Sequence, residues 1–161
     1  MDEKEFLTEL RAHQGIIYKV VSMYATNDEE KKDFYQEIVL QCWKGIGGFR
    51  GEAKFSTWLY RIAINTVLTL RRKKNILQFN ELLPDAGFEP PAVFDQEDRW
   101  QLQAAIRLLS ETDKAMALLF LDGYEISEMA AIMGISAAHT SVRMYRIKQR
   151  LAKIIHSKQH E

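Results

Sequence analysis

Aromatic and basic side chains alternate along residues 47–74, where the sequence is GGFRGEAKFSTWLYRIAINTVLTLRRKK. Aromatic faces stack on unpaired bases, by about 1–3 kcal/mol per base, and nearby cations hold phosphates, so this mixture favours a surface for single-stranded nucleic acid. The interleaved residues are Phe49, Arg50, Lys54, Phe55, Trp58, Tyr60 and Arg61. The alternative is that Phe55 and Trp58 anchor a small helical core and that the final Arg-Arg-Lys-Lys is a solvated helix end. Core burial is less expected of Phe49, which follows a glycine-rich stretch.

Residues 125–151 carry a second candidate site, a helix-turn-helix. Ala130 supplies a small side chain where two helix backbones approach, Gly134 can take the positive φ of a tight turn, and Ser136 can cap the second helix. The predicted inward stripe of that helix is Thr140, Met144, Ile147 and Leu151. The other faces carry His139, Ser141, Val142, Arg143, Tyr145, Arg146 and Arg150, of which the early ones could reach base edges and the basic ones could grip phosphates. The alternative is an ordinary helical hairpin whose second helix is basic because cations suit a helix C-terminus.

The whole-chain composition says less about a nucleic-acid partner than the distribution of charge does. The 161 residues are 47% hydrophobic and 27% charged, which excludes collagen-like, wholly disordered and disulfide-scaffold chains. The formal net charge is zero, from 22 basic and 22 acidic residues. Residues 61–74, however, carry basic residues and no acid, residues 75–98 carry acids and no base, and residues 143–161 are basic apart from Glu161.

Apolar residues recur at three- and four-residue spacing, which predicts an all-helical protein. The first domain is expected to contain three helices around one core. The first has the stripe Phe6, Leu10, His13, Ile17, Val20 and Tyr24, and the second begins after an Asn27–Asp28 cap. The third is expected to start near Ser56 or Thr57 and to end at about Lys74. Its predicted inward residues are Leu59, Ile62, Ala63, Thr66 and Leu70.

The pattern breaks in the stretch that holds all three prolines of the chain, Pro84, Pro90 and Pro91, which indicates a linker. We therefore predict a first domain at residues 1–75, a linker at 76–98 and a second helical domain at 99–161. In the second domain, Ser110 is expected to cap one helix and Gly123 to end it. Two further helices are expected to begin near Ser127 and Ala137.

Cys42 is the only cysteine, so no internal disulfide can form, and a lone thiol in an apolar helical pattern is most often a small core residue. We expect a cytoplasmic protein, because no stretch approaches the roughly 20 apolar residues that cross a bilayer. The spacing of the His and Cys residues gives little support to a metal site, and no cofactor is expected. No nucleophile, base and orienting group occur at credible spacing, so binding rather than catalysis is predicted.

Three segments together resemble one family, the extracytoplasmic-function sigma factors, which are two-domain initiation subunits of bacterial RNA polymerase. DFYQEIVLQCW at residues 33–43 is similar to the family's polymerase-binding helix, FRGEAKFSTWLYRIAIN at 49–65 to its minus-10 segment, and residues 125–151 to its minus-35 reader. The resemblance implies a three- or four-helix domain like sigma region 2 and a helix-turn-helix domain like region 4, joined by a flexible linker. The implied partners are core RNA polymerase, promoter DNA and an anti-sigma protein.

The resemblance also implies roles for individual residues. Asp33, Gln36 and Glu37 would dock on the clamp helices of the largest polymerase subunits; the alternative is a solvated helix face. Phe49 and Asn65 match positions that handle a flipped base of the minus-10 strand, with Arg61 and the Arg-Arg-Lys-Lys end on adjacent phosphates. The implied minus-10 set is Phe49, Arg50, Lys54, Trp58, Arg61 and Asn65, and the minus-35 set is His139, Ser141, Val142, Arg143, Tyr145, Arg146 and Arg150.

The recognition helix departs from the family at its start. Ala138, His139, Thr140, Ser141 and Val142 stand where relatives usually have Gly-Thr-Val, a basic residue and Ser, which predicts different base preferences. The acidic linker is similar in placement to the family's connector through the RNA-exit path of the polymerase; alternatively, its acids and prolines only keep it extended and soluble. Two alternative functions are a helix-turn-helix regulator that acts without polymerase, and a small helical enzyme that uses Cys42 or a histidine.

Overall fold

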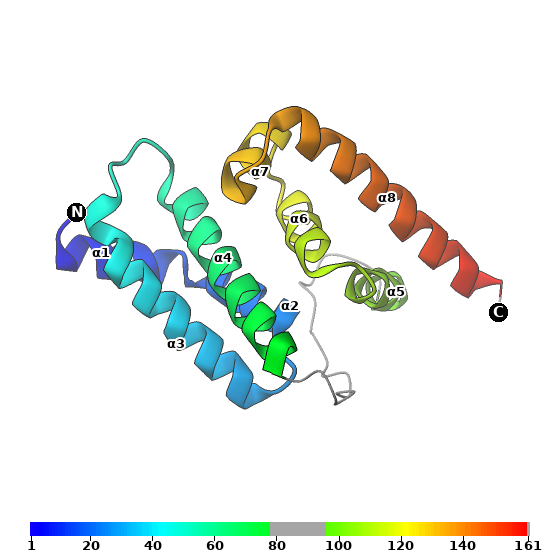
Figure 1. Ribbon diagram of the computed structural model, residues 1–161, viewed down its shortest axis with the longest axis horizontal. Helices are drawn as coiled ribbons and strands as arrows, with labels where there is room; N and C mark the ends of the chain where they lie inside the picture. Colours follow the sequence, from blue (N-terminus) through cyan, green and yellow to red (C-terminus); the bar gives the residue numbers. More distant parts are fainter. Residues whose placement is uncertain (78–95, 161) are drawn as a thin grey trace. The chain divides into compact units, whose positions relative to one another are not determined.

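The computed structural model describes residues 1–77 and 96–160, and all regular structure in these ranges is helical (Figure 1). The chain divides into two compact units, Met1–Gly87 (unit 1) and Phe88–Glu161 (unit 2). Most of the predicted linker lies outside the described residues. Its two ends are helical, because one helix continues to Leu77 and the next begins at Gln96. The all-α prediction is therefore confirmed.

Unit 1 has four α-helices in its described residues, where the sequence pattern predicted three. They are α1 (Glu3–Ala12), α2 (Gln14–Tyr24), α3 (Asp28–Gly45) and α4 (Phe55–Leu77), with a short 3₁₀ turn, η1, at Ile46–Gly48. The first predicted helix is divided at His13, whose backbone N–H bonds to the carbonyl of Glu9 and whose carbonyl accepts from Ile16. The apolar stripe continues across this break, which is why periodicity alone did not reveal it.

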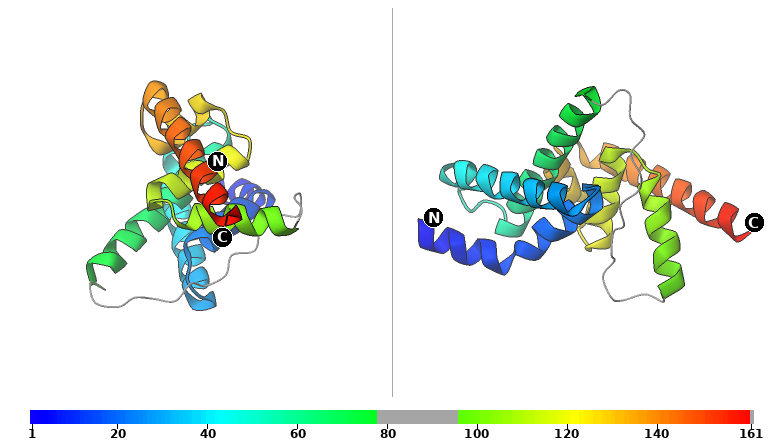
Figure 2. Two further views of the ribbon diagram at one scale, coloured as in Figure 1. Left: turned by 90° about the vertical axis from the view of Figure 1, so that its right-hand side faces the viewer. Right: turned by 90° about the horizontal axis from the view of Figure 1, so that it is seen from below.

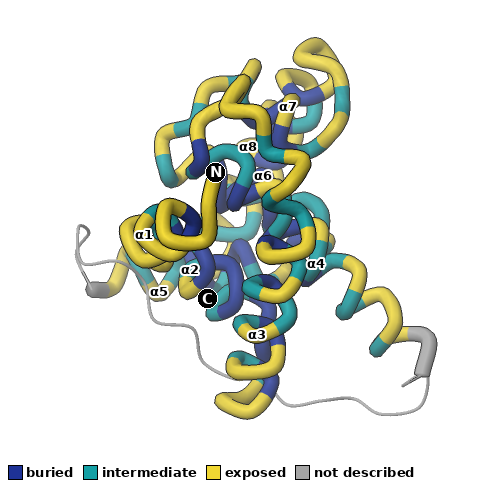
Figure 3. Tube along the Cα trace, turned by 90° about the vertical axis from the view of Figure 1, so that its left-hand side faces the viewer, coloured by how far each residue is buried: buried dark blue, intermediate teal, exposed yellow. Residues whose placement is uncertain are grey.

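α3 and α4 pack against each other (Figure 2), and their buried residues form much of the core of unit 1 (Figure 3). The predicted cap of α3 is confirmed, since the side chain of Asn27 accepts from the N–H of Glu30 at 2.8 Å. The predicted inner face of α4 was only partly right. Leu59 and Ala63 are buried, but Ile62, Thr66 and Leu70 are only half-buried. The buried face also contains Phe55, Tyr60, Ile64 and Val67, because α4 meets α2 as well as α3.

A buried carboxylate joins the start of α3 to the end of α4. Glu30 accepts hydrogen bonds from the backbone N–H and the hydroxyl of Thr26, and from Lys74 Nζ at 3.1 Å. Arg71 Nη1 lies 3.6 Å from the same carboxylate. Burial alone would raise the pKa of Glu30, but the bonds from Thr26 and the bond and charge of Lys74 hold it below the ordinary value of 4.5.

In its described residues, unit 2 has three helices of 8 to 12 residues and one of 23 residues around a second core. They are α5 (Gln96–Arg107), α6 (Glu111–Leu121), α7 (Ile126–Met133) and α8 (Ala137–Gln159). Ser110 caps α6 by accepting from the N–H of Asp113, and Gly123, with φ of 84°, follows its end. Both of these sequence predictions are confirmed.

The predicted helix-turn-helix is present as α7, a tight turn and α8. Gly134 adopts φ of 69°, a left-handed conformation that favours glycine, and Ser136 accepts from the N–H of His139. Thr140, Met144 and Ile147 are buried, as expected of the inward stripe, while Leu151 is half-buried. The polar member of that stripe is satisfied locally, since the hydroxyl of Thr140 donates to the carbonyl of Ser136. No helix in the described ranges is long and apolar enough to cross a membrane.

Candidate nucleic-acid interface

A layered aromatic cluster lies where the loop before α4 meets the helix. The rings of Phe49 and Trp58 lie 5.2 Å apart, and both contact Phe55, at 5.8 and 5.3 Å between centroids. Phe55 is buried, whereas Phe49 and Trp58 are half-buried. The prediction that Phe55 could be a core anchor is therefore right, and Phe55 supports two rings that keep exposed surface for stacking. Tyr60 is fully buried, so its inclusion among the stacking residues was wrong.

The loop also forms one wall of an open hollow of about 790 Å³. Phe49, Arg50 and Phe55 line it on the loop side. The opposite wall belongs to α1, which contributes Lys4, Glu5, Thr8 and Glu9. Sequence reasoning missed α1 here, because its residues lie about 40 positions before the loop and carry no motif.

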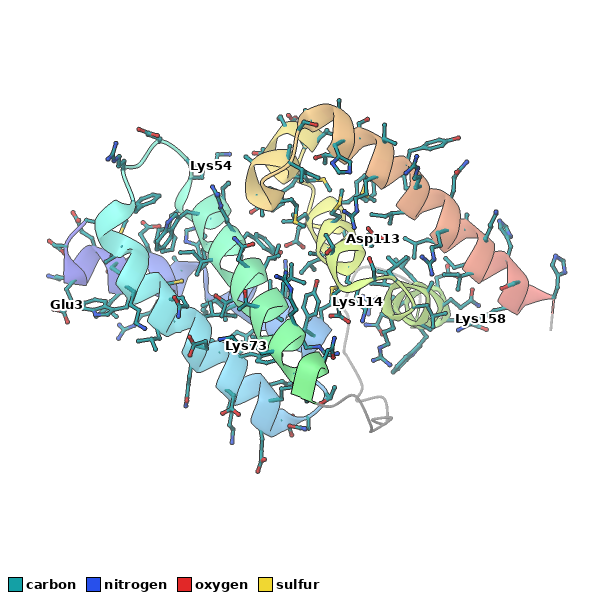
Figure 4. The ribbon with its side chains drawn as sticks, in the orientation of Figure 1. Glu3, Lys54, Lys73, Asp113, Lys114 and Lys158 are labelled. Carbon is teal, nitrogen blue, oxygen red and sulfur yellow. The ribbon has the colours of Figure 1, made fainter. Side chains whose placement is uncertain are left out.

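Exposed cations surround the aromatic cluster. Arg50, Lys54 and Arg61 are all exposed, and Figure 4 shows Lys54 at the start of α4. The basic end of α4, residues 71–74, was predicted to bind phosphates as a whole, but only part of it is exposed. Arg71 and Lys74 face Glu30, which leaves Arg72 and Lys73 as the exposed members.

Asn65 lines a separate polar groove of about 290 Å³ between α3 and α4. The groove also holds Glu37, Gln41, Thr66, Thr69, Leu70 and Lys73. The two residues predicted to handle the flipped base thus line different hollows, since Phe49 belongs to the larger one. Trp58, whose ring contacts Phe49, and Asn65 are seven residues apart on α4, which is about 10 Å along the helix axis. The groove instead brings Asn65 together with Glu37, a residue predicted for polymerase docking.

The outer face of α3 carries the remaining predicted docking residues. Asp33 and Gln36 are exposed, while Glu37 is half-buried and accepts a 2.7 Å hydrogen bond from Gln41 Nε2. The same helix exposes two large apolar side chains that sequence reasoning did not single out, Leu40 and Trp43, at 43% and 47%. Their position beside Asp33 and Gln36 was recoverable from helical spacing, but apolar residues in such a pattern are normally assigned to the core.

In unit 2 the predicted minus-35 residues separate into two groups. A hollow of about 380 Å³ between α6 and α8 is lined by His139, Val142, Arg143, Arg146, Ile147, Arg150 and Asp113. Arg143 is the half-buried member of the predicted set, because its Nε donates to Asp113 Oδ1 at 2.7 Å. Ser141 and Tyr145 are exposed outside this hollow, and the hydroxyl of Tyr145 accepts from Gln149.

Cys42 has the properties of a core residue, as predicted. Its side chain is fully buried and unpaired, and burial raises the pKa of the thiol to about 12. Such a thiol is protonated at neutral pH and is a poor nucleophile. Within residues 1–77 and 96–160, the structure has no group of three His, Cys, Asp or Glu side chains that could hold a metal ion.

Comparison with known proteins gives consistent matches. Residues 10–76 match the family model of sigma-70 region 2. The chain is 29% identical to the ECF RNA polymerase sigma factor SigM of Mycobacterium tuberculosis, over 96% of this chain and 79% of the relative. It is 25% identical to the ECF sigma factor SigW of Bacillus subtilis, over 94% and 89%, and 26% identical to the ECF sigma-E factor of Escherichia coli, over 92% and 85%.

Two solved structures share the fold. One is the sigma factor RpoE in complex with the anti-sigma factor NepR from Bartonella quintana, with a TM-score of 0.79, 19% identity, and coverage of 94% of this chain and 97% of that one. The other is CnrH in complex with the cytosolic domain of CnrY, with a TM-score of 0.69, 17% identity, and coverage of 97% and 90%. These similarities extend over both units of the chain.

Proposed function

We infer the roles of the two units from one premise: the chain belongs to the extracytoplasmic-function group of sigma-70 factors, and its function is promoter-directed initiation of transcription. Unit 1 docks on core RNA polymerase and captures the minus-10 strand, and unit 2 binds the minus-35 duplex. The chain acts by binding, and phosphodiester synthesis belongs to the polymerase. It works in the cytoplasm, where its partners are.

The aromatic cluster of unit 1 carries this proposal. Phe49 and Trp58 keep exposed ring surface while buried Phe55 holds them in place, so the surface is formed before a base arrives. Arg50, Lys54 and Arg61 lie exposed on the same loop and helix and supply charge for the adjacent phosphates. A regulator that only binds duplex DNA has no use for an ordered stacking surface outside its helix-turn-helix.

Docking on polymerase is assigned to the outer face of α3. Asp33 and Gln36 are exposed there, and Leu40 and Trp43 add apolar area that a partner would cover. Glu37 belongs to this face only in part, since it also lines the groove with Asn65. We assign the groove to the captured strand, with Asn65 as its base-contacting amide.

An anti-sigma protein is the proposed inhibitor. One solved structure with this fold is described as a sigma factor in complex with the anti-sigma factor NepR. Another is described as a complex of CnrH with the cytosolic domain of CnrY. An inhibitor that covers α3 and α8 would block polymerase docking and duplex binding at the same time. A pull-down of the chain from cells that recovers polymerase and no other protein would contradict the proposed anti-sigma partner.

The central experiment measures binding to core polymerase and initiation at a promoter. We expect the double variant Gln36→Ala with Glu37→Ala to lose co-purification with core enzyme and to lose specific transcripts from a genomic library. The matched control is Glu3→Ala with Gln14→Ala, which removes an acid and an amide from exposed positions on α1 and α2. Promoter binding that is independent of core enzyme would instead favour a regulator without polymerase.

A further inference from the structure

We propose that the hollow between α6 and α8 holds one backbone phosphate of duplex DNA, and that Asp113 is the positioning residue that aims Arg143 at it. This proposal rests on the proposed duplex-binding role of unit 2. In this proposal Arg143 binds one phosphate of the DNA backbone, whereas the sequence placed it only among the residues of the recognition helix that contact DNA. It also gives a role to an acidic residue on α6, a helix for which no DNA contact was predicted.

The ion pair is the first observation. Arg143 Nε donates to Asp113 Oδ1 at 2.7 Å, a short distance for a charge-assisted hydrogen bond, and joins two helices across 30 residues of sequence. The guanidinium has five N–H groups, of which Nε carries one, so the four on the Nη nitrogens are available to a second acceptor. A planar guanidinium held at Nε can therefore present its other edge to a phosphate in a fixed direction.

The second observation is the charge of the hollow. Three arginines, Arg143, Arg146 and Arg150, line it against the single carboxylate of Asp113, so two positive charges remain after the pair is counted. His139 lies on the same wall. This positive excess attracts a singly charged phosphate diester. The basic side chain of Lys148 is not part of the site, because its ammonium lies 4.2 Å from the ring centroid of Phe120.

The third observation is the position of these residues around α8. With about 100° between successive residues, Arg143 and Arg150 project at one edge of the exposed face, next to the buried stripe, while Val142 and Arg146 lie nearer its centre. When a helix enters a major groove, side chains at its centre reach base edges and side chains at its margins meet the backbone. Arg143 therefore has the position expected of a phosphate contact.

Asp113 could instead oppose DNA binding, since a carboxylate near a phosphate is repulsive. The two roles predict opposite signs. If Asp113 only adds negative charge or competes for Arg143, its removal tightens DNA binding. If it fixes the direction of Arg143, its removal weakens DNA binding although the chain becomes more positive. This opposition makes the proposal testable with one variant.

The experiment uses the full chain and a fluorescent duplex of random sequence, because a phosphate contact does not depend on sequence. Affinity is measured by anisotropy at several salt concentrations below about 100 mM. We expect Arg143→Ala to weaken binding about tenfold and to lower the slope of log affinity against log salt by about 0.9, the loss of one phosphate contact. We expect Asp113→Asn to weaken binding about threefold and to have no further effect in the Arg143→Ala background.

Glu111→Gln is the matched control. Glu111 lies in the same first turn of α6 and pairs with Lys114 at 3.3 Å, so this variant removes the same charge but leaves the Arg143 contact in place. We expect it to bind duplex as tightly as the wild type or slightly more tightly. Arg143→Lys keeps the positive charge but replaces the planar guanidinium with a single ammonium centre, which cannot be held at one edge and directed by the other. We expect it to weaken binding as Arg143→Ala does. Thermal melts identify any variant that fails to fold.

Three results would overturn the proposal: Asp113→Asn binding at least as tightly as Glu111→Gln, Arg143→Lys binding like the wild type, or a wild-type chain with no salt-dependent binding to duplex. None of them decides the proposed function, which is measured by specific transcripts with core polymerase. Conversely, a chain that binds duplex with the expected pattern but never supports initiation would retain the phosphate site and lose the sigma-factor mechanism.

Discussion

The two units differ in how the basic residues of their longest helices, α4 and α8, are paired. In unit 1, the basic end of α4 is partly neutralised inside the protein, because Arg71 and Lys74 face the buried carboxylate of Glu30. On α8 of unit 2, Arg146 and Arg150 are exposed, while Arg143 pairs with Asp113. What unit 1 presents in addition to charge is aromatic surface, at Phe49 and Trp58.

This difference matches two kinds of nucleic acid. An unpaired base offers a flat π-face on which an aromatic ring can stack. A duplex offers phosphates at high density, and binding to them falls steeply with salt because condensed ions are released. Unit 1 is therefore suited to holding an open strand, and unit 2 to finding and gripping closed DNA. These two proposed roles are compatible with the zero net charge of the whole chain.

The largest expected effect is on strand capture by unit 1. We expect Phe49→Ala to slow open-complex formation by holoenzyme about 5- to 150-fold, because one stacked base contributes about 1–3 kcal/mol. Binding of the chain to upstream duplex should not change. The measurement is the rate of promoter opening, followed with a fluorescent base in the minus-10 strand. Trp100→Ala, which removes an aromatic side chain that is 58% exposed in unit 2, is the control. Equal loss of opening and duplex binding would contradict the division between the units.

The next effect is on the stability of unit 1. We expect Glu30→Gln to lower the free energy of unfolding by about 2 kcal/mol, because it removes a charged acceptor that Thr26 and Lys74 both use. The pKa of Glu30 is lowered in the folded protein, so its contribution is complete above the ordinary value of 4.5 and is lost as the pH falls through the lower folded pKa. Urea unfolding should therefore separate wild type from variant at pH 7 and bring them together in acid. A constant difference down to pH 3 would contradict this assignment.

The sequence predicted well those features of both units that depend on neighbouring residues. Asn27 and Ser136 cap their helices and Gly134 takes positive φ, because caps and turns follow local rules of backbone geometry. The inner stripe of α8 was also predicted, since one face of that helix meets one core.

Features that depend on distant residues were not predicted. Glu30 meets Lys74 across 44 residues and Asp113 meets Arg143 across 30, and no periodicity indicates which charges will pair. The inner face of α4 was misjudged because the helix packs on two neighbours, which turns Tyr60 and Ile64 inward. Phe49 and Asn65 were expected at one base, and only the fold shows that they line different hollows.

A smaller effect compares the two units through salt. We expect Arg146→Ala to weaken binding of the chain to an upstream duplex severalfold and to lower the salt slope, because it removes a positive charge from the exposed face of α8. Trp58→Ala should weaken binding of a minus-10 single strand without changing the slope, because stacking releases no ions. Titrations from about 50 to 200 mM salt measure both. If both variants change the slope of their own titration by the same amount relative to the wild type, charge and stacking are not divided between the units as proposed.

The smallest functional effect is expected at Cys42. With a pKa raised to about 12, only about one thiol in ten thousand is ionised at pH 8, and the side chain is fully buried. We expect Cys42→Ala to support normal promoter-specific transcription while destabilising unit 1 by about 1 kcal/mol, through the small cavity that it leaves. Loss of transcription by a folded Cys42→Ala protein would contradict this expectation and favour an enzymatic role for the thiol.

Because Cys42 is the only cysteine, its slow reaction with a thiol reagent reports the opening of unit 1 alone. A destabilisation of about 2 kcal/mol raises the open population about 30-fold, so Glu30→Gln should speed labelling by about that factor. Asp113→Asn changes a contact within unit 2 and should leave the labelling rate unchanged, since the two units have separate cores. If Asp113→Asn speeds labelling as much as Glu30→Gln does, the units unfold as one, and effects of unit 2 variants on promoter opening could no longer be assigned to duplex contacts.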